Sequence, residues 1–116
     1  MPSNALPPAR RIRRRGEFQR VFDAGRRAHG RYLTIIAAPA PGPDSRLGIV
    51  ASKKLGGAVV RNRAKRLIRQ VFRTEPSPAR PSDLVIIPKN SALQVVITEL
   101  VTDYNATLRR LSLSKQ

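Results

Sequence analysis

The segment from Ala58 to about Thr74 constrains the fold of this chain more than any other, because its periodicity fits a long amphipathic helix. At 100° per residue its larger apolar side chains fall within about 140° of arc; they are Val60, Ala64, Leu67, Ile68, Val71 and Phe72. The opposite side carries six cations and no acid, namely Arg61, Arg63, Lys65, Arg66, Arg69 and Arg73. A solvated face normally mixes both signs, and like charges on one helix repel each other. The pattern therefore predicts a helix with one face in the core and a basic face that binds phosphates.

The charge of the whole chain points to the same class of partner. The 116 residues include 23 Lys and Arg against 7 Asp and Glu, which gives a formal net charge of +16. A surface this basic favours a polyanion, whether RNA, DNA or an anionic membrane. The chain has no cysteine and one histidine, His29. This composition excludes a disulfide framework, a cysteine zinc site, a thiol nucleophile and a His-rich metal site.

Length and local patterns predict one α+β domain, a small sheet packed by helices, over residues 1–116. Residues 1–10 are expected to be a disordered tail marked by prolines. Helices are expected at 17–24, 58–74 and about 96–111, and strands at 32–38, 47–51 and 84–87. The short Pro-Gly loop between the first two strands favours an antiparallel hairpin. The third strand is apolar throughout, which predicts burial on both faces.

One run of the sequence matches a known signature. From Ser52 to Arg69 the chain reads S-K-K-L-G-G-A-V-V-R-N-R-A-K-R-L-I-R. It resembles the S-K-K-x-G-x-A-V-x-R-N-R-x-K-R-x-x-R pattern of the bacterial ribonuclease P protein subunit. Residues 15–22, with Phe18 and Phe22, look like the first helix of that family, and residues 82–87 look like its last strand.

The resemblance implies a fold and a function. The fold is a two-layer single domain of order αβββαβα, with one strand more than the local patterns indicate. It includes a left-handed crossover around the long basic helix, an exception to the usual hand. The function is to assist an RNA catalyst that removes the 5′ leader from precursor tRNA. The partners are then the ribonuclease P RNA and precursor tRNA, with Mg²⁺ acting on the RNA subunit and none bound by the protein alone.

The resemblance also assigns two RNA-binding surfaces. One faces the catalytic RNA and comprises Lys53, Lys54, Arg61, Asn62, Arg63, Lys65, Arg66 and Arg69. The other is a cleft between the first helix and the sheet, which takes the single-stranded leader on Phe18 and Phe22, because unstacked bases bind aromatic rings. Ile36 stands where the family often has an aromatic residue. Strand alternation would place Tyr32 on the same face, where it could serve instead. The alternative for both phenylalanines is a place in the core.

Neither catalytic residues nor a metal site are expected on the protein itself. Metal-dependent nucleases gather carboxylates around Mg²⁺, whereas the closest helical pair here, Glu99 and Asp103, is interpreted as a solvated face. Other interpretations remain open: a ribosomal protein or RNA chaperone, a DNA-binding protein that uses the long helix, or a protein-only nuclease. The sequence has no apolar run of the roughly 20 residues needed to span a membrane. It also begins without the features of a signal peptide, so a cytoplasmic protein without membrane or protein partners is expected.

Overall fold

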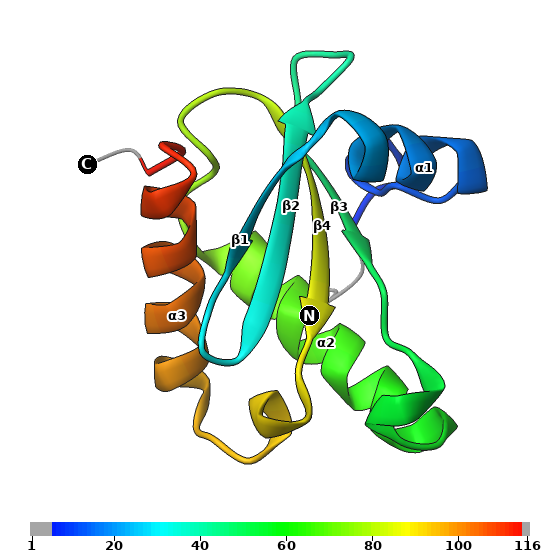
Figure 1. Cartoon of the computed structure of the whole chain (residues 1–116), viewed down its shortest axis with the longest axis vertical. Helices are drawn as coiled ribbons and strands as arrows, with labels where there is room; N and C mark the ends of the chain where they lie inside the picture. Colours follow the sequence, from blue (N-terminus) through cyan, green and yellow to red (C-terminus); the bar gives the residue numbers. More distant parts are fainter. Residues whose placement is uncertain (1–5, 115–116) are drawn as a thin grey trace.

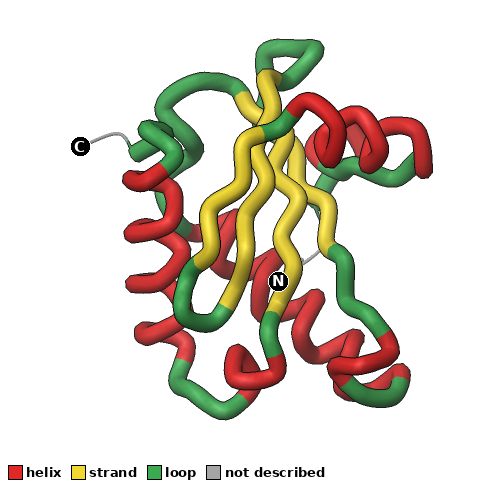
Figure 2. The backbone as a smooth tube through the Cα atoms, viewed as in Figure 1, coloured by secondary structure: helices red, strands yellow, loops and turns green. Residues whose placement is uncertain are grey.

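A four-stranded sheet with helices on both faces forms the body of the protein (Figures 1 and 2). This structure, a computed structural model, describes residues 6–114. The main elements are α1 Arg15–Ala24, β1 Arg26–His29, β2 Leu33–Pro39, β3 Arg46–Ile49, α2 Ala58–Thr74, β4 Ser82–Pro88 and α3 Ile97–Arg110. Single 3₁₀ turns occur at Pro8–Arg10, Lys53–Leu55 and Asn90–Leu93. The α+β class and the order αβββαβα are therefore confirmed, and no described helix is long and apolar enough to cross a membrane.

The strands lie in the order β1-β2-β4-β3, so β4 separates two strands that follow each other in the sequence. β2 is antiparallel to both of its neighbours, β1 and β4. β3 is parallel to β4, with Leu47 opposite Leu84. The antiparallel hairpin predicted between residues 32–38 and 47–51 is therefore wrong, because the central strand comes from much later in the chain.

The connection from β3 through α2 to β4 is a left-handed crossover. In the view of Figure 1 both strands run downward, α2 passes behind the sheet, and the chain moves from β3 to β4 on its left. Most parallel crossovers have the opposite hand, so the exception implied by the family resemblance is present. The crossover lays α2 across one face of the sheet and carries its N-terminal half past the β3 edge (Figure 1).

Two apolar layers fill the space on the two faces of the sheet. On the face covered by α2 and α3, the sheet contributes Leu33, Ile35, Leu84 and Ile86 to the larger layer. Under α1, the smaller layer consists of Ile12, Val21, Ile36, Ala38 and Val85. Because β4 contributes to both layers, the predicted burial of this strand on both faces is confirmed.

The N-terminal segment is folded from residue 6 onward, which corrects the expectation of a tail up to residue 10. Leu6 is only 4% exposed and belongs to the larger apolar layer. The Arg10 guanidinium lies 5.2 Å from the centre of the Phe72 ring, and its Nε donates to the Ser45 carbonyl at 2.9 Å. Apolar burial and these two contacts anchor the segment. Residues 1–5 of the predicted tail lie outside the described residues.

Candidate RNA-binding surfaces

Helix α2 presents a row of cations that we call the α2 ridge: Arg61, Arg63, Lys65, Arg66 and Arg69. The opposite side of the helix is anchored in the core by four buried residues of the predicted apolar stripe, Ala64, Ile68, Val71 and Phe72. The other two residues of that stripe, Val60 and Leu67, are half-buried. Arg63 and Arg66 are exposed, and the other three cations are half-buried. Among the described residues, no acidic side chain forms an ion pair with any cation of the ridge. The ridge is therefore rigidly held and not neutralised within the protein.

The chain enters α2 through a tight turn that extends the basic surface. Gly56 has φ +149°, and a Cβ at this position would lie 2.9 Å from Val60 Cβ, so the turn requires glycine. Just before it, Lys53 and Lys54 are exposed on a 3₁₀ turn, and Asn62 is exposed on the first turns of the helix. The predicted RNA-binding residues thus lie together on α2 and the turn before it.

Several acidic residues hold structural contacts outside the α2 ridge. Asp103 is buried in α3, and its carboxylate accepts the backbone N–H groups of Arg31 and Tyr32 at 2.7 and 2.8 Å. Its expected place on a solvated face is therefore wrong. Glu75 accepts a hydrogen bond from Asn105 at 2.9 Å. Both carboxylates accept hydrogen bonds from groups on other elements, and neither forms an ion pair with a cation of the α2 ridge.

Phe18 and Phe22 extend from α1 over the smaller apolar layer, beside Ile36 and Val85. Both phenylalanines are half-buried, whereas Ile36 is only 1% exposed. The Phe18 ring lies directly over β3, because a Cβ on Gly48 would approach its Cε1 to 2.7 Å. Three of the four predicted cleft residues are thus brought together, and the two rings combine packing on the sheet with partial exposure.

Tyr32 does not belong to this group, which corrects the predicted cleft. It precedes β2, and its ring packs on the opposite side of the sheet, with the larger apolar layer. Its N–H donates to Asp103 of α3, and its carbonyl accepts the N–H of Lys89 at 2.9 Å. Strand alternation places side chains only within a strand, and the chain turns at residues 31–32 before the strand begins.

A buried ionic cluster that local sequence patterns do not report fixes α1 on the sheet. Asp83 of β4 is fully buried and accepts two hydrogen bonds from Arg46 of β3, from Nε at 2.9 Å and from Nη2 at 2.6 Å. Arg46 also donates to Glu17 of α1 at 2.7 Å, and Arg20 of α1 pairs with Asp83. Arg46 and Asp83 could be paired in advance only by knowing the parallel register of β3 and β4, which sets the two residues opposite each other.

The same cluster shifts the ionisation of its members. The pKa of Glu17 falls from 4.5 to about 2, chiefly because Arg46 donates to its carboxylate and also because the backbone N–H of Arg14 does so. The hydrogen bond to Asp83 raises the pKa of Arg46. Glu17 also accepts the N–H of Arg13, and these backbone bonds begin α1 two residues earlier than predicted. The cluster therefore holds the helix that carries Phe18 in one position.

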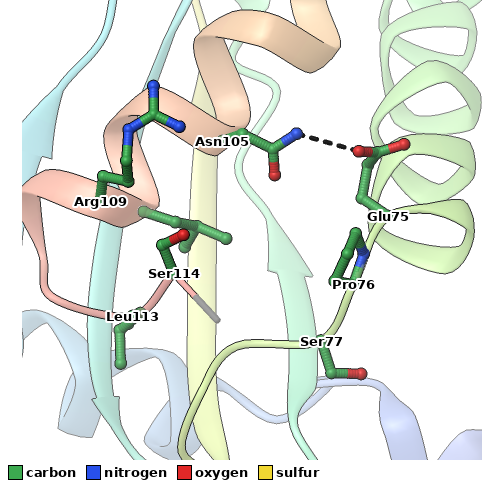
Figure 3. Close-up of a pocket in the computed structure, with 8 residues that line it drawn as sticks. Glu75, Pro76, Ser77, Asn105, Arg109, Leu113 and Ser114 are labelled. Atoms are coloured by element: carbon green, nitrogen blue, oxygen red, sulfur yellow. Dashed lines mark hydrogen bonds between the residues drawn. The ribbon is translucent and has the colours of Figure 1, made fainter. Parts of the chain in front are cut away.

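Two of the pockets lie away from the phenylalanines and from the α2 ridge. The pocket in Figure 3, about 160 Å³, lies between the C-terminal end of α2 and the end of α3, where Asn105 bonds to Glu75. Arg109 borders this pocket, far along the chain from the α2 ridge. A second pocket, about 310 Å³, lies beside α3 and is lined by Tyr32 and Asp103 among others. Neither pocket is lined by Phe18, Phe22 or a cation of the α2 ridge.

Comparison with known proteins identifies the family. The family model described as Ribonuclease P matches residues 6–112. The chain is 33% identical over 111 residues to the ribonuclease P protein component of Citrifermentans bemidjiense, covering 96% of each chain. It is 35% identical over 107 residues to that of Bacillus velezensis, covering 91% and 92%.

Solved structures share the fold. The ribonuclease P protein of Staphylococcus aureus superposes with a TM-score of 0.79 at 28% identity, covering 90% of this chain and 96% of the other. That of Thermotoga maritima gives 0.75 at 29% identity, covering 86% and 96%. The sequence match and the superposed fold agree over nearly the whole described chain, and this chain therefore belongs to the ribonuclease P protein family.

Proposed function

We propose that the protein works within ribonuclease P by binding two RNAs at once, the catalytic RNA and the 5′ leader of precursor tRNA. The α2 ridge, with Lys53 and Lys54 beside it, binds phosphates of the catalytic RNA. One observation carries this assignment: a rigid helix face of cations has no acidic partner among the described residues. Phosphates relieve the repulsion within such a face and release counterions when they bind.

The half-buried rings of Phe18 and Phe22 form the surface for the leader. Stacking of an unpaired base on an aromatic side chain contributes roughly 1–3 kcal/mol. The leader is present in the precursor and absent from the mature tRNA, so this contact favours the substrate over the product. Ile36 lies beneath the rings as buried support.

Cleavage itself is assigned to the RNA subunit and its Mg²⁺. The donor set supports this assignment, because Asp83 is engaged by Arg46 and Arg20, and Asp103 by backbone amides. The described residues contain no group of three His, Asp or Glu side chains suited to a metal ion. The protein then lowers the Mg²⁺ requirement by neutralising phosphates where two RNAs meet. We expect this activity in the cytoplasm.

Reconstitution tests the proposal. The protein is added to a bacterial ribonuclease P RNA at low Mg²⁺, and leader removal from precursor tRNA is measured. The wild type should stimulate cleavage, and Arg61→Ala with Arg66→Ala should weaken binding to the RNA and lower the slope of log K against log salt by about two. A matched control replaces two exposed arginines away from α2, Arg80 and Arg109, by alanine. Equal slopes for the two double variants would reject the α2 ridge as the phosphate contact.

A second arm tests the cleft. Phe18→Leu keeps an apolar side chain over Gly48 but removes the aromatic ring. Affinity for precursor tRNA should fall while affinity for mature tRNA stays unchanged, because only the precursor carries a leader. An equal loss for both substrates would place Phe18 in the core alone.

A further inference from the structure

A groove at the open edge of β3 connects the two candidate RNA surfaces. It encloses about 200 Å³ and is lined by four cations, Arg11, Arg13, Lys65 and Arg69, together with Phe18. The other lining residues are apolar or glycine, and no acidic side chain borders the groove. Phe18 comes from the α1 side of the sheet, whereas Lys65 and Arg69 come from α2 on the other side. The groove therefore wraps around the sheet edge from one surface to the other.

The local structure explains why the groove exists. β3 is an edge strand, and the N-terminal segment covers it only in part, through a single isolated bridge. The N–H of Ile12 donates to the Leu47 carbonyl at 2.9 Å, which sets Arg11 and Arg13 beside the edge. Lys65 and Arg69 are four residues apart on α2 and so lie on the same side of the helix. The four cations are thus placed by two separate pieces of backbone, the N-terminal segment and α2.

Arg11 is the unusual member of the groove. Its Nε is buried without a hydrogen-bond partner, one of three such side-chain atoms among the described residues. Two other arginines with buried positions have protein partners, because Arg10 donates to Ser45, and Arg46 donates to Asp83 and Glu17. The buried Nε of Arg61 on the α2 ridge has no described partner either. The two Nη atoms of the Arg11 guanidinium are not among these buried atoms and have no hydrogen-bond partner in the described part of the chain, so they are the donors that Arg11 can offer to a ligand in the groove.

We infer that the groove is a phosphate site for the single-stranded leader, an inference that rests on the function proposed above. A nucleotide stacked on Phe18 is followed by a phosphodiester that turns around the β3 edge and binds the guanidinium of Arg11, with Lys65 and Arg69 beside it. The planar fork of arginine suits two phosphate oxygens. A cationic groove next to an aromatic platform is also the usual arrangement for binding unpaired strands. The cleft and the α2 ridge then form one continuous path for RNA.

The test compares Arg11→Gln with Arg109→Gln in the reconstituted holoenzyme. Both variants lose one positive charge, but Arg109 is exposed at the pocket of Figure 3, away from the groove. Affinities are measured for precursor tRNA, for mature tRNA and, with the protein alone, for the ribonuclease P RNA. Arg11→Gln should weaken precursor binding about five- to tenfold and lower its salt slope by about 0.7, the value for one phosphate of a single strand. Binding of mature tRNA and of the ribonuclease P RNA should match the Arg109→Gln control.

Three results would overturn the inference. They are an equal loss for precursor and mature tRNA, a loss confined to the ribonuclease P RNA, and no difference between the two variants. Circular dichroism melting checks that Arg11→Gln folds. If Arg11→Gln does not fold, Arg13→Gln takes its place, because Arg13 is exposed in the same groove; it should weaken precursor binding by a smaller factor, with binding of mature tRNA unchanged. If wild-type protein fails to stimulate cleavage, the proposed function fails; if it stimulates and Arg11→Gln equals its control, only the groove assignment fails.

Discussion

Replacing Asp83 by asparagine should be the most destabilising single-charge change in this protein. The carboxylate is fully buried and accepts hydrogen bonds from Arg46 and Arg20. The asparagine keeps the shape but removes the negative charge. Arg46, whose side chain is only 16% exposed, is then left with Glu17 as its sole anionic partner.

The expected loss is about 3 kcal/mol of unfolding free energy. Removing one partner of a buried ion pair costs about 3–5 kcal/mol, because the other charge stays buried without compensation. The lower end applies, because Arg46 retains Glu17, and Arg20 is 41% exposed and can turn to water. For a domain of about 100 residues this corresponds to a fall of roughly 10–15 °C in Tm.

Urea unfolding followed by circular dichroism measures the loss. Asp44→Asn is the matched control, because Asp44 is exposed in the loop before β3, and it should change stability by less than about 0.5 kcal/mol. A double-mutant cycle of Asp83→Asn with Arg46→Met should show coupling of about 1–3 kcal/mol. A loss below about 1 kcal/mol for Asp83→Asn, or additive effects in the cycle, would refute the reasoning that this cluster fixes α1.

Further predictions concern ionisation and packing. Glu17 has a pKa lowered to about 2, so its contribution is complete above pH 4.5 and is lost as the pH falls toward 2; acid titration of stability should show a loss of about 1 kcal/mol that Glu17→Gln lacks. Gly48→Ala would bring a Cβ to 2.7 Å from Phe18 Cε1, so thermal unfolding should show about 1–3 kcal/mol of destabilisation, and titration with precursor tRNA should show weaker binding; unchanged values would contradict the close approach. Tyr104→Phe removes a buried hydroxyl without a described hydrogen-bond partner, so the protein should melt at the same temperature or higher, with a gain of up to about 1 kcal/mol.

The α2 helix could be predicted from the sequence because all of its information is local. Its residues 58–74 carry the 3.6 period over almost five turns, and the structure reproduces both ends. The cations follow from the same periodicity, since any helix that buries Ile68 and Phe72 must present Arg63 and Arg66 to solvent. The α2 ridge can therefore be predicted without knowledge of tertiary contacts.

Strand order could not be obtained from loop length. The short loop after β2 favours a hairpin, but the tertiary fold inserts β4 instead. The apolar run of residues 84–87 carried the decisive information, because a strand with both faces buried belongs in the middle of a sheet. A strand in the middle of the sheet needs a neighbour on each side, and this requirement disfavours direct pairing of the two strands of the predicted hairpin.

The remaining misses come from residues whose partners are distant in sequence. β1, Arg26–His29, has no apolar alternation and is defined only by its pairing with β2. Tyr32 is turned toward α3 by Asp103, and Arg20 meets Asp83 63 residues further on. Periodicity reports the faces of an element, but it does not report contacts of this kind.

The central position of β4 governs when the protein can fold during its synthesis. Until residue 88 has left the ribosome, β3 has no neighbouring strand in the sheet, and β2 has only β1. The strongly cationic helix α2 emerges before that point, on a nascent chain whose sheet is still incomplete. The tertiary structure can therefore close only after β4 has emerged, and long-range pairing of this kind slows folding.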